Sequence, residues 1–343
     1  MKAAFLTGHG GNEVVTVGER PLPPRAPGQV RVRLHAATLN RVDLYMRDSG
    51  AGITHALPQI MGLDGAGVVD EADADEPLLT PGQRVLLHPG VACGRCEFCL
   101  RGDDVLCTRY QLLGEHRDGT FAQYVTVPAR NALPLPEGWS FAEGAALGVN
   151  HLTAWRMLVT QARLKAWETV LVFGIGGGVS LAGLQIAKAL GARVIVTSRD
   201  DAKLARALQL GADHAVHSAT QDVAKAVQSL TGGRGVDVVF ENVGEAVWPR
   251  IAVLCERPKG GSPTAREAAV RRAIETQGRE APSRTLSLRR EARCRRSREA
   301  AKRQGLCSEA RSGSGARAHV RRRTTPRRKA PCQGQRITTR FAP

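Results

Sequence analysis

The fold is decided by residues 169–190, which read TVLVFGIGGGVSLAGLQIAKAL. The first five residues form a short apolar run, typical of a strand that is buried on both faces. Residues 174–178 form a glycine loop, and Ser180–Leu190 is an apolar segment typical of a helix that ends at Gly191. Because the strand, the loop and the helix follow one another directly, this stretch predicts a dinucleotide-binding turn.

The glycines give this loop its expected chemistry. Glycine lets the backbone approach a pyrophosphate, while the helix N-terminus offers free N–H groups and partial positive charge. We therefore predict that the loop and the residue after it bind a coenzyme through Gly174, Gly176, Gly177, Gly178 and Val179. A tight turn that binds no ligand is the alternative.

Strands and helices continue to alternate after this loop, which predicts a doubly wound parallel sheet of the Rossmann type in an α/β fold. A second strand is expected at Arg193–Thr197, and a helix follows it at Asp201–Leu210 and stops at Gly211. The alternation then continues through His214–His217, Val223–Leu230 and Val236–Phe240.

The end of the second strand sets the coenzyme preference. A carboxylate there accepts the ribose hydroxyls of NAD, whereas small and basic residues accommodate the extra phosphate of NADP. Here the strand ends at Ser198 and Arg199, with Lys203 one helical turn further on, while Asp200 and Asp201 are expected at the helix N-terminus. We predict NADP(H), with NAD(H) still possible. Arg199 as a solvated surface residue is the alternative.

Residues 1–150 read instead as short strands separated by turns. Gln29–Leu34 alternates in side-chain character, and Gly65–Val69 and Arg84–Leu87 are apolar runs bounded by Gly, Pro and Asp. This pattern predicts a β-rich domain with few helices. We expect it to be followed by a partial Rossmann domain at 151–254 and a separate tail at 255–343.

Four cysteines, Cys93, Cys96, Cys99 and Cys107, form one cluster in the β-rich part. Zinc accepts four thiolates in a tetrahedron, and C-x2-C spacing lets successive ligands face one centre. With all four positions filled, we predict a structural zinc site with no open position for chemistry. A nucleic-acid-binding zinc ribbon is the alternative, but the local charges are balanced and form no basic face. The cluster also favours a reducing, cytoplasmic setting over a disulfide framework.

The net charge of +17 belongs to the end of the chain. Residues 1–254 hold 24 Lys+Arg and 25 Asp+Glu, a net of −1, whereas residues 255–343 hold 25 Lys+Arg and 7 Glu, a net of +18. The basic pI is therefore no sign of a nucleic-acid-binding enzyme. The last 89 residues contain only eight of Val, Ile, Leu, Met or Phe, a composition that predicts disorder.

Several linked segments resemble the medium-chain dehydrogenase/reductase superfamily, nearer its quinone-reductase-like branch than its zinc alcohol dehydrogenases. They are residues 37–43 (ATLNRVD), 62–67 (GLDGAG), 93–107, 152–155 (LTAW) and the glycine loop. The resemblance covers residues 1–254. It implies that the first domain is a GroES-like β-barrel with the substrate cleft and that the second is a Rossmann domain.

The resemblance also implies site residues. It places Asn40 and Asp43 beside the nicotinamide, with Asn40 as a donor to the developing oxyanion. A turn in which both side chains only bond local backbone is an equal alternative. By motif position, further coenzyme contacts fall on Thr153, Asn242 and Gly244, and His116 and His151 are candidate proton-relay residues.

A departure from the family decides the expected reaction. The catalytic zinc ligands of its alcohol dehydrogenases fall here on Asn40, Leu63 and about Val149. Leu and Val cannot ligate zinc, and Asn is a poor ligand for it. We therefore predict hydride transfer to a quinone, an enone or a similar carbonyl acceptor without catalytic zinc. A zinc-dependent alcohol dehydrogenase is the enzymatic alternative.

The tail is the second departure. The family continues with a fifth and a sixth strand, which the composition after Leu254 is not expected to provide, so the fourth strand is predicted to be an unpaired edge. The tail contains 22 Arg in 89 residues, a composition that resembles the translation of a GC-rich gene in a shifted reading frame. A defective enzyme whose tail binds nucleic acid without sequence preference is the non-enzymatic alternative. The homo-oligomer usual for the family becomes doubtful here. We expect neither a signal peptide nor a membrane span.

Overall fold

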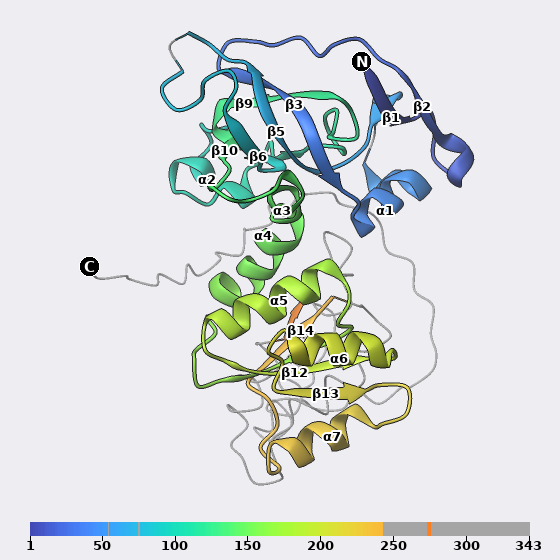
Figure 1. The fold of residues 1–343 in the computed structure, drawn as a ribbon, viewed down its shortest axis with the longest axis vertical. Coiled ribbons are helices and arrows are strands. Elements are labelled where there is room, and N and C mark those ends of the chain that lie inside the picture. Colours follow the sequence, from blue (N-terminus) through green and yellow to red (C-terminus); the bar gives the residue numbers. More distant parts are fainter. Residues whose placement is uncertain (54, 75, 243–272, 276–343) are drawn as a thin grey trace, which may run out of the picture. The chain divides into compact units, whose positions relative to one another are not determined.

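The protein is described by a computed structural model for residues 1–53, 55–74, 76–242 and 273–275 (Figure 1). All of these residues belong to one compact unit, Met1–Glu280. Within the described ranges, no helix has both the length and the apolar character needed to cross a membrane. The tail predicted to be disordered lies outside the described residues, apart from the short segment 273–275. The domain boundaries predicted at 150 and 254 stay predictions.

The N-terminal part is built from antiparallel sheets, as the alternating runs predict. Its largest sheet has the order β10-β6-β5-β3-β9, a second has the order β2-β1-β4, and β7 pairs with β8. The strands are β1 (Lys2–Leu6), β2 (Val15–Glu19), β3 (Gln29–Thr38), β4 (Gln59–Ile60), β5 (Asp64–Glu71), β6 (Arg84–Leu87), β7 (Gly90–Val91), β8 (Gln111–Leu112), β9 (Tyr124–Pro128) and β10 (Ala132–Pro134).

Alternation along β3 shows why these residues form a sheet. Val30 and Val32 are fully buried, whereas Arg33, the residue after Val32, is exposed. The buried valines pack with Val85 and Leu87 of β6 and with Val125 of β9 in one hydrophobic core. The core therefore lies on one face of the β10-β6-β5-β3-β9 sheet.

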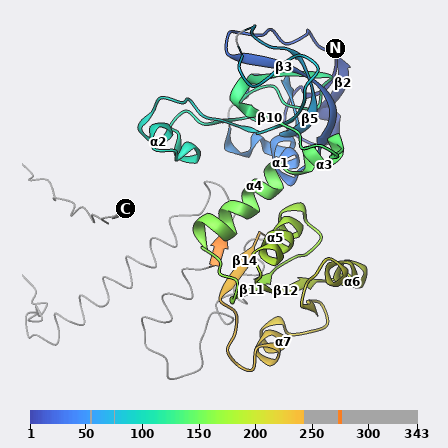
Figure 2. The same ribbon diagram turned by 60° about the vertical axis from the view of Figure 1, so that its left-hand side comes forward.

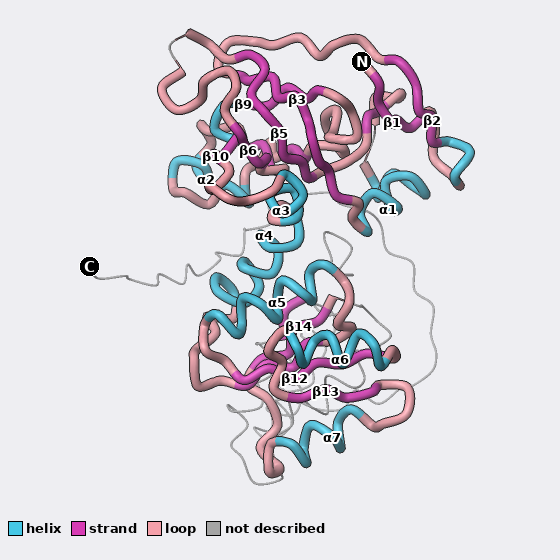
Figure 3. The backbone as a smooth tube through the Cα atoms, in the orientation of Figure 1, coloured by secondary structure: helices cyan, strands magenta, loops and turns pink. Residues whose placement is uncertain are grey.

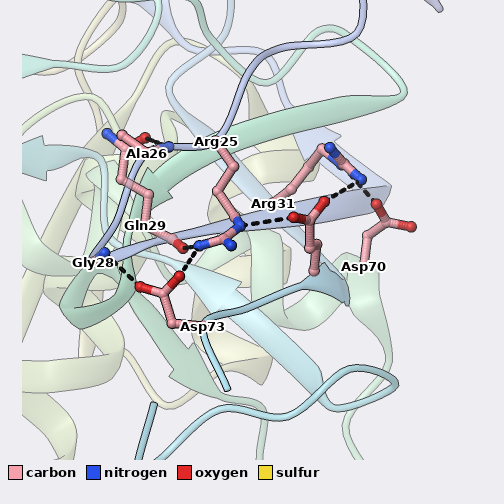
Figure 4. Close-up of polar contacts among 8 residues, drawn as sticks. Arg25, Ala26, Gly28, Gln29, Arg31, Asp70 and Asp73 are labelled. Atoms are coloured by element: carbon pink, nitrogen blue, oxygen red, sulfur yellow. Dashed lines mark hydrogen bonds and ion pairs between the residues drawn. The ribbon is translucent and has the colours of Figure 1, made fainter. Parts of the chain in front are cut away.

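A network of charged residues closes the turn that enters β3 (Figure 4). The Nε atom of Arg25 donates to Glu71 at 3.0 Å, and its guanidinium also pairs with Asp73. The second carboxylate oxygen of Asp73 accepts the backbone N–H of Gly28 at 2.6 Å, and Arg31 pairs with Glu71 at 2.7 Å. The Gly28 N–H and the Arg25 guanidinium hold the pKa of Asp73 below its ordinary value.

Helices in this part are short, in agreement with the β-rich prediction. The α-helices are α1 (Arg41–Ser49), α2 (Glu97–Leu100), α3 (Phe141–Ala146) and α4 (Val149–Trp155). Single turns of 3-10 helix occur at η1 (Asn12–Val14), η2 (Gly50–Gly52), η3 (Asp104–Leu106) and η4 (Ala129–Asn131), and α4 runs on into a π-helical stretch, η5 (Arg156–Gln161).

From residue 169 the described strands are parallel and alternate with helices (Figure 3). The strands are β11 (Thr169–Val172), β12 (Arg193–Ser198), β13 (His214–His217), β14 (Val238–Glu241) and β15 (Ala273–Glu275), and the helices are α5 (Gly178–Ala189), α6 (Asp201–Gln209) and α7 (Val223–Leu230). These bounds confirm the predicted alternation, with element ends within about two residues of the predicted ones.

The parallel sheet is covered on both faces. Val170 and Val172 of β11 pack into the core that includes α5 and α6, whereas Leu171, between them, packs into the core that includes Val223 and Val227 of α7. Figures 1 and 2 show α5 and α6 on one side of the strands and α7 on the other. Burial of both strand faces explains why β11, β12 and β14 read as continuous apolar runs rather than alternating ones.

The prediction of an unpaired fourth strand is wrong. β15 pairs in parallel with β14, with Val239 opposite Ala273 and Phe240 opposite Ile274, which gives the sheet order β13-β12-β11-β14-β15. The prediction rested on the small number of large apolar side chains after Leu254. That number indicates whether a segment can fold independently, and not whether it can pair with an existing strand. A three-residue strand pairs through its backbone and needs no such composition. A sixth strand is not found among the described residues.

Candidate functional site

The glycine loop lies between β11 and α5, where it was predicted. Gly174 and Gly176 adopt positive φ angles of 64° and 118°, conformations that favour glycine. The backbone N–H of Gly174 donates to the Thr197 hydroxyl at 3.2 Å, and the N–H of Ile175 donates to the Thr197 carbonyl at 2.8 Å. The loop is therefore fixed against the end of β12, and the exposed glycines Gly176, Gly177 and Gly178 stay accessible.

Ser180 ties this loop to the next strand of the sheet. Its buried hydroxyl donates to the carbonyl of Phe173 at 3.0 Å and lies 3.0 Å from Oδ1 of Asn242, just after β14. Asn242 is thus brought to the same edge of the sheet as the glycine loop. Val179 is half-buried and packs against the sheet core, and Gly244 lies outside the described residues.

The end of β12 presents the residues predicted to choose the coenzyme. Ser198 is buried, and its hydroxyl accepts the backbone N–H of Asp200 at 3.2 Å. Asp200 is the N-cap of α6 and accepts the N–H of Lys203 at 3.2 Å, so this carboxylate serves the helix as predicted. Arg199 is exposed. A Cβ on Gly176 would lie 2.7 Å from Cδ of Lys203, so the Lys203 stem lies across the glycine loop.

The four cysteines of the 93–107 loop converge. Their Sγ atoms all lie within 4.8 Å of one another, with Cys93 and Cys99 separated by 3.9 Å and Cys96 and Cys99 by 3.4 Å. Tetrahedral zinc with bonds of about 2.3 Å holds its sulfurs about 3.8 Å apart, so this donor set fits the ion. The backbone N–H of Arg95 lowers the pKa of the Cys93 thiol to about 5, with a further contribution from Arg109.

Asn40 and Asp43 lie at the start of α1, where both are buried. Asn40 is the N-cap, and the Asp43 carboxylate accepts its backbone N–H at 2.7 Å. The Asn40 side-chain amide donates to the hydroxyl of Thr38 at 3.3 Å and to the carboxylate of Asp64 at 2.7 Å. The local backbone bonding expected from the turn interpretation is thus present, together with a tertiary partner in Asp64.

Three buried carboxyl groups gather at this place. Burial, and then the charge of Asp64, raises the pKa of Asp43 to about 6. Burial also raises the pKa of Asp64 above its ordinary value. Burial, and then the charge of Asp43, raises the pKa of Glu115 to about 7. Burial therefore disfavours the charged form of each of these three carboxyl groups.

In comparisons with known proteins, two parts of the chain match two family models. Residues 26–137 match the alcohol dehydrogenase GroES-like domain, and residues 178–261 match the zinc-binding dehydrogenase family. An alcohol dehydrogenase of Geobacillus stearothermophilus is 34% identical over 242 residues, which cover 70% of each chain. The quinone oxidoreductase of Rattus norvegicus is 32% identical over 242 residues, which cover 70% of this chain and 66% of the relative.

A solved structure of an NAD-dependent alcohol dehydrogenase is also similar, with 44% identity, a TM-score of 0.72 and 74% of each chain covered. The chain belongs to the medium-chain dehydrogenase/reductase superfamily. This superfamily of NAD(P)-dependent oxidoreductases combines a GroES-like domain with a Rossmann-like fold, which confirms the predicted fold class. The chain matches about two thirds of the length of these curated relatives.

The positions predicted from the family resemblance to correspond to catalytic zinc ligands are Asn40, Leu63 and about Val149. Leu63 is buried and apolar. The Asp64 carboxylate accepts the Asn40 amide through Oδ2 and the backbone N–H of Val149 through Oδ1, each at 2.7 Å. Asp64 thereby joins the ends of β3 and β5 to the first residue of α4. Among the described residues, only the cysteine cluster brings three or more potential ligand atoms close enough together to hold one metal ion.

The predicted histidines have partners already. The ring nitrogens of His151 contact the carbonyl of Ala146 at 3.2 Å and Oε1 of Gln185 at 3.1 Å. Nδ1 of His116 accepts the backbone N–H of Leu112 at 3.2 Å. Thr153 is half-buried on α4. The role of His116 and His151 as proton-relay residues stays a prediction.

Sequence reasoning missed two residues of this site. Asp64 heads a strand of small and apolar residues, and a carboxylate in such a run has to find partners, which was the available signal. Asn150 follows the Val149 anchor, and its side-chain amide donates to Oδ1 of Asn40 at 3.3 Å. No local pattern points to Asn150, because its partner is 110 residues away in the sequence.

Proposed function

We propose that the protein is an NADP(H)-dependent oxidoreductase that reduces a quinone, an enone or a similar carbonyl acceptor without catalytic zinc. The observation that carries this proposal is the glycine loop between β11 and α5, with the aliphatic stem of Lys203 lying beside Gly176. Free N–H groups at the start of a 12-residue helix and a nearby cation suit a pyrophosphate.

The preference for NADP(H) rests on the end of β12. This strand ends at Ser198 rather than at a carboxylate, and the next carboxylate, Asp200, is engaged as the cap of α6. Arg199 is exposed beside Ser198 and offers a planar set of donors to a phosphate. A 2′-phosphate therefore finds a hydroxyl and a guanidinium, whereas a ribose hydroxyl finds no free carboxylate among these residues.

The proposed acceptor class follows from the residues near Asn40. A nicotinamide coenzyme supplies the hydride, and a proton from solvent completes the reduction of the acceptor. The chain then has to position an acceptor that is already activated. Asn40 fits the role of oxyanion donor because its 3.3 Å bond to Thr38 is long and can be exchanged for a bond to substrate. Asp43 supports Asn40, because the Asp43 carboxylate accepts the backbone N–H of Asn40.

Further parts of the proposal concern the remaining predicted contacts. Thr153 and Asn242 complete the coenzyme site from α4 and from the end of β14. The four cysteines hold one structural zinc, which keeps the 93–107 loop folded and supplies no chemistry. Their thiolates favour the reducing cytoplasm as the setting. The three-part division at residues 150 and 254 belongs to the same proposal.

A fluorescence titration with NADPH and with NADH, at low and at high salt, tests this function. High salt is needed because the 25 Lys and Arg residues of the last 89 attract any polyphosphate. We expect saturable, salt-resistant binding that favours NADPH, followed by turnover with 1,4-naphthoquinone. Binding that disappears at high salt would remove the proposal.

Metal analysis of the purified protein separates the proposed reductase from a zinc-dependent alcohol dehydrogenase. One zinc per chain is expected for the reductase, because only the cysteine cluster provides a ligand set among the described residues. Two zinc ions per chain would favour the alcohol dehydrogenase, since that activity needs a second, open metal site.

A further inference from the structure

Asn150 contacts two parts of the proposed site at once. On one side its amide nitrogen lies 3.3 Å from Oδ1 of Asn40. On the other side it fills the space next to Gly178, the first residue of α5. A Cβ built on Gly178 would lie 2.5 Å from Nδ2 of Asn150 and 2.7 Å from its Oδ1. The side chain is therefore packed between the N-cap of α1 and the N-terminus of α5.

The backbone next to Asn150 is fixed by a hydrogen bond to Asp64. The fully buried carboxylate of Asp64 accepts the N–H of Val149 and the amide of Asn40, so two neighbours of the Asn150 side chain share one anchor. α4 also lies along α5, as Figures 1 and 2 show. An anchor that receives charge-assisted hydrogen bonds in a dry site is stiff. The contact with Gly178 then has little freedom to relax.

We propose that Asn150 is a positioning residue that couples the glycine loop to Asn40. A coenzyme pyrophosphate that binds at the N-terminus of α5 moves or fixes Gly178, and the Asn150 amide carries that change to the Asn40 amide. Coenzyme binding thereby sets the orientation of the group that faces the acceptor. The kinetic part of this inference rests on the proposed function, whereas the packing part does not.

A double-mutant cycle tests the packing part. Gly178 has an ordinary backbone conformation, so Gly178→Ala adds a methyl group whose main conflict is with Asn150. We expect Gly178→Ala to lower Tm by several degrees and to weaken NADPH binding at high salt by about tenfold. In the Asn150→Ala background the same methyl group has room. Its effect there should fall to about 1 °C and to less than about threefold.

The neighbouring glycine provides a matched control for stability. A Cβ on Gly177 meets its nearest atoms at 3.9 and 4.0 Å, which is ordinary contact. Gly177→Ala should therefore shift Tm little in either background. Additive effects of Gly178→Ala and Asn150→Ala would overturn the proposal, because they would mean that the two residues do not interact.

Kinetics with 1,4-naphthoquinone test the link to Asn40. Asn150→Ala should lower kcat by about tenfold while the dissociation constant of NADPH stays within about threefold of the wild-type value. An unchanged kcat would remove the coupling but leave the proposed function in place. Failure of the wild-type protein itself to bind NADPH at high salt would remove the proposed function, and the Tm cycle would still decide whether Asn150 and Gly178 interact.

Discussion

The carboxylate of Asp64 and the backbone N–H of Val149 are joined by a hydrogen bond of 2.7 Å, although the two residues are 85 positions apart. Asp64 is fully buried, and its other oxygen receives the Asn40 amide and the Thr38 hydroxyl, each at 2.7 Å. One carboxylate thus satisfies donors from β3, from the N-cap of α1 and from α4. The bond explains how α4 begins at a defined place beside the sheet that contains β5.

Asp64→Asn tests this anchor. The substitution keeps the size of the side chain but replaces one acceptor oxygen by a donor, which leaves at least one buried donor unsatisfied. We expect the free energy of unfolding to fall by about 1–3 kcal/mol, measured by denaturant titration. Asp70→Asn is the matched control, since Asp70 is exposed and its pairing with Arg31 is a surface ion pair worth about 0–1 kcal/mol. Equal losses in both variants would contradict the anchor.

Glu115→Gln tests the buried acidic group through the pH dependence of stability. The pKa of Glu115 rises to about 7 from an ordinary value of 4.5, chiefly through burial. Between these values the unfolded chain has released a proton that the folded chain retains, so stability falls as pH rises through this window. The Gln variant loses this penalty and should be more stable than wild type by about 2 kcal/mol above pH 7.

A residual slope should remain in that variant, because the raised pKa of Asp43, about 6, acts in the same direction. Glu97→Gln is the control, since Glu97 is largely exposed and pairs with Arg101 only at 4.0 Å. Unfolding curves at several pH values measure both effects. A wild-type stability that is flat from pH 4.5 to 7 would show that Glu115 titrates normally.

Arg199→Ala tests the coenzyme preference. An exposed guanidinium that binds a 2′-phosphate contributes one or two charge-assisted hydrogen bonds, which are absent with NADH. We expect NADPH binding at high salt to weaken by about tenfold, while NADH binding stays within about threefold. Arg206→Ala, on the α6 helix that follows Arg199, should change neither, because Arg206 bonds to Gln209. An equal loss of affinity for both coenzymes would mean that Arg199 acts only through general charge attraction and does not select NADPH.

Cys96→Ser tests the cysteine cluster. With three thiolates left, we expect zinc content measured by mass spectrometry to fall from one per chain to well below one, and Tm to fall by several degrees. Cys255→Ser replaces a cysteine that does not belong to the 93–107 set and should leave the zinc content unchanged. Retention of one zinc per chain in Cys96→Ser would place the metal elsewhere.

Local patterns predicted most of the parallel sheet. The apolar run Thr169–Phe173, the loop glycines and the stop at Gly191 act within a few residues, so β11 and α5 lie where the pattern places them. Asp200 could be placed at the cap of α6 for the same reason. β15 was missed because three residues in an arginine-rich segment carry no periodic signal, and their pairing with β14 is tertiary.

The network around Asp64 shows where such prediction ends. Residues 62–67 were recognised as a family motif, but the motif does not say which donors reach the Asp64 carboxylate. Those donors come from Asn40 and Val149, which are 24 and 85 positions away. Asn150 gives even less signal, since its contact with Gly178 depends on the packing of α4 along α5. Hydrogen-bond partners at such separations are set by the fold and not by the local sequence.

The two cores of the parallel sheet have a consequence for the order in which the chain is made. Their described members end at Phe240, which precedes the arginine-rich residues 255–343. A ribosome that synthesises the chain from its N-terminus therefore releases every described core residue before it has completed the arginine-rich segment. The apolar faces of β11, β12 and β14 can be buried by α5, α6 and α7 during synthesis. This limits the time for which exposed apolar surface is present together with the arginine-rich segment.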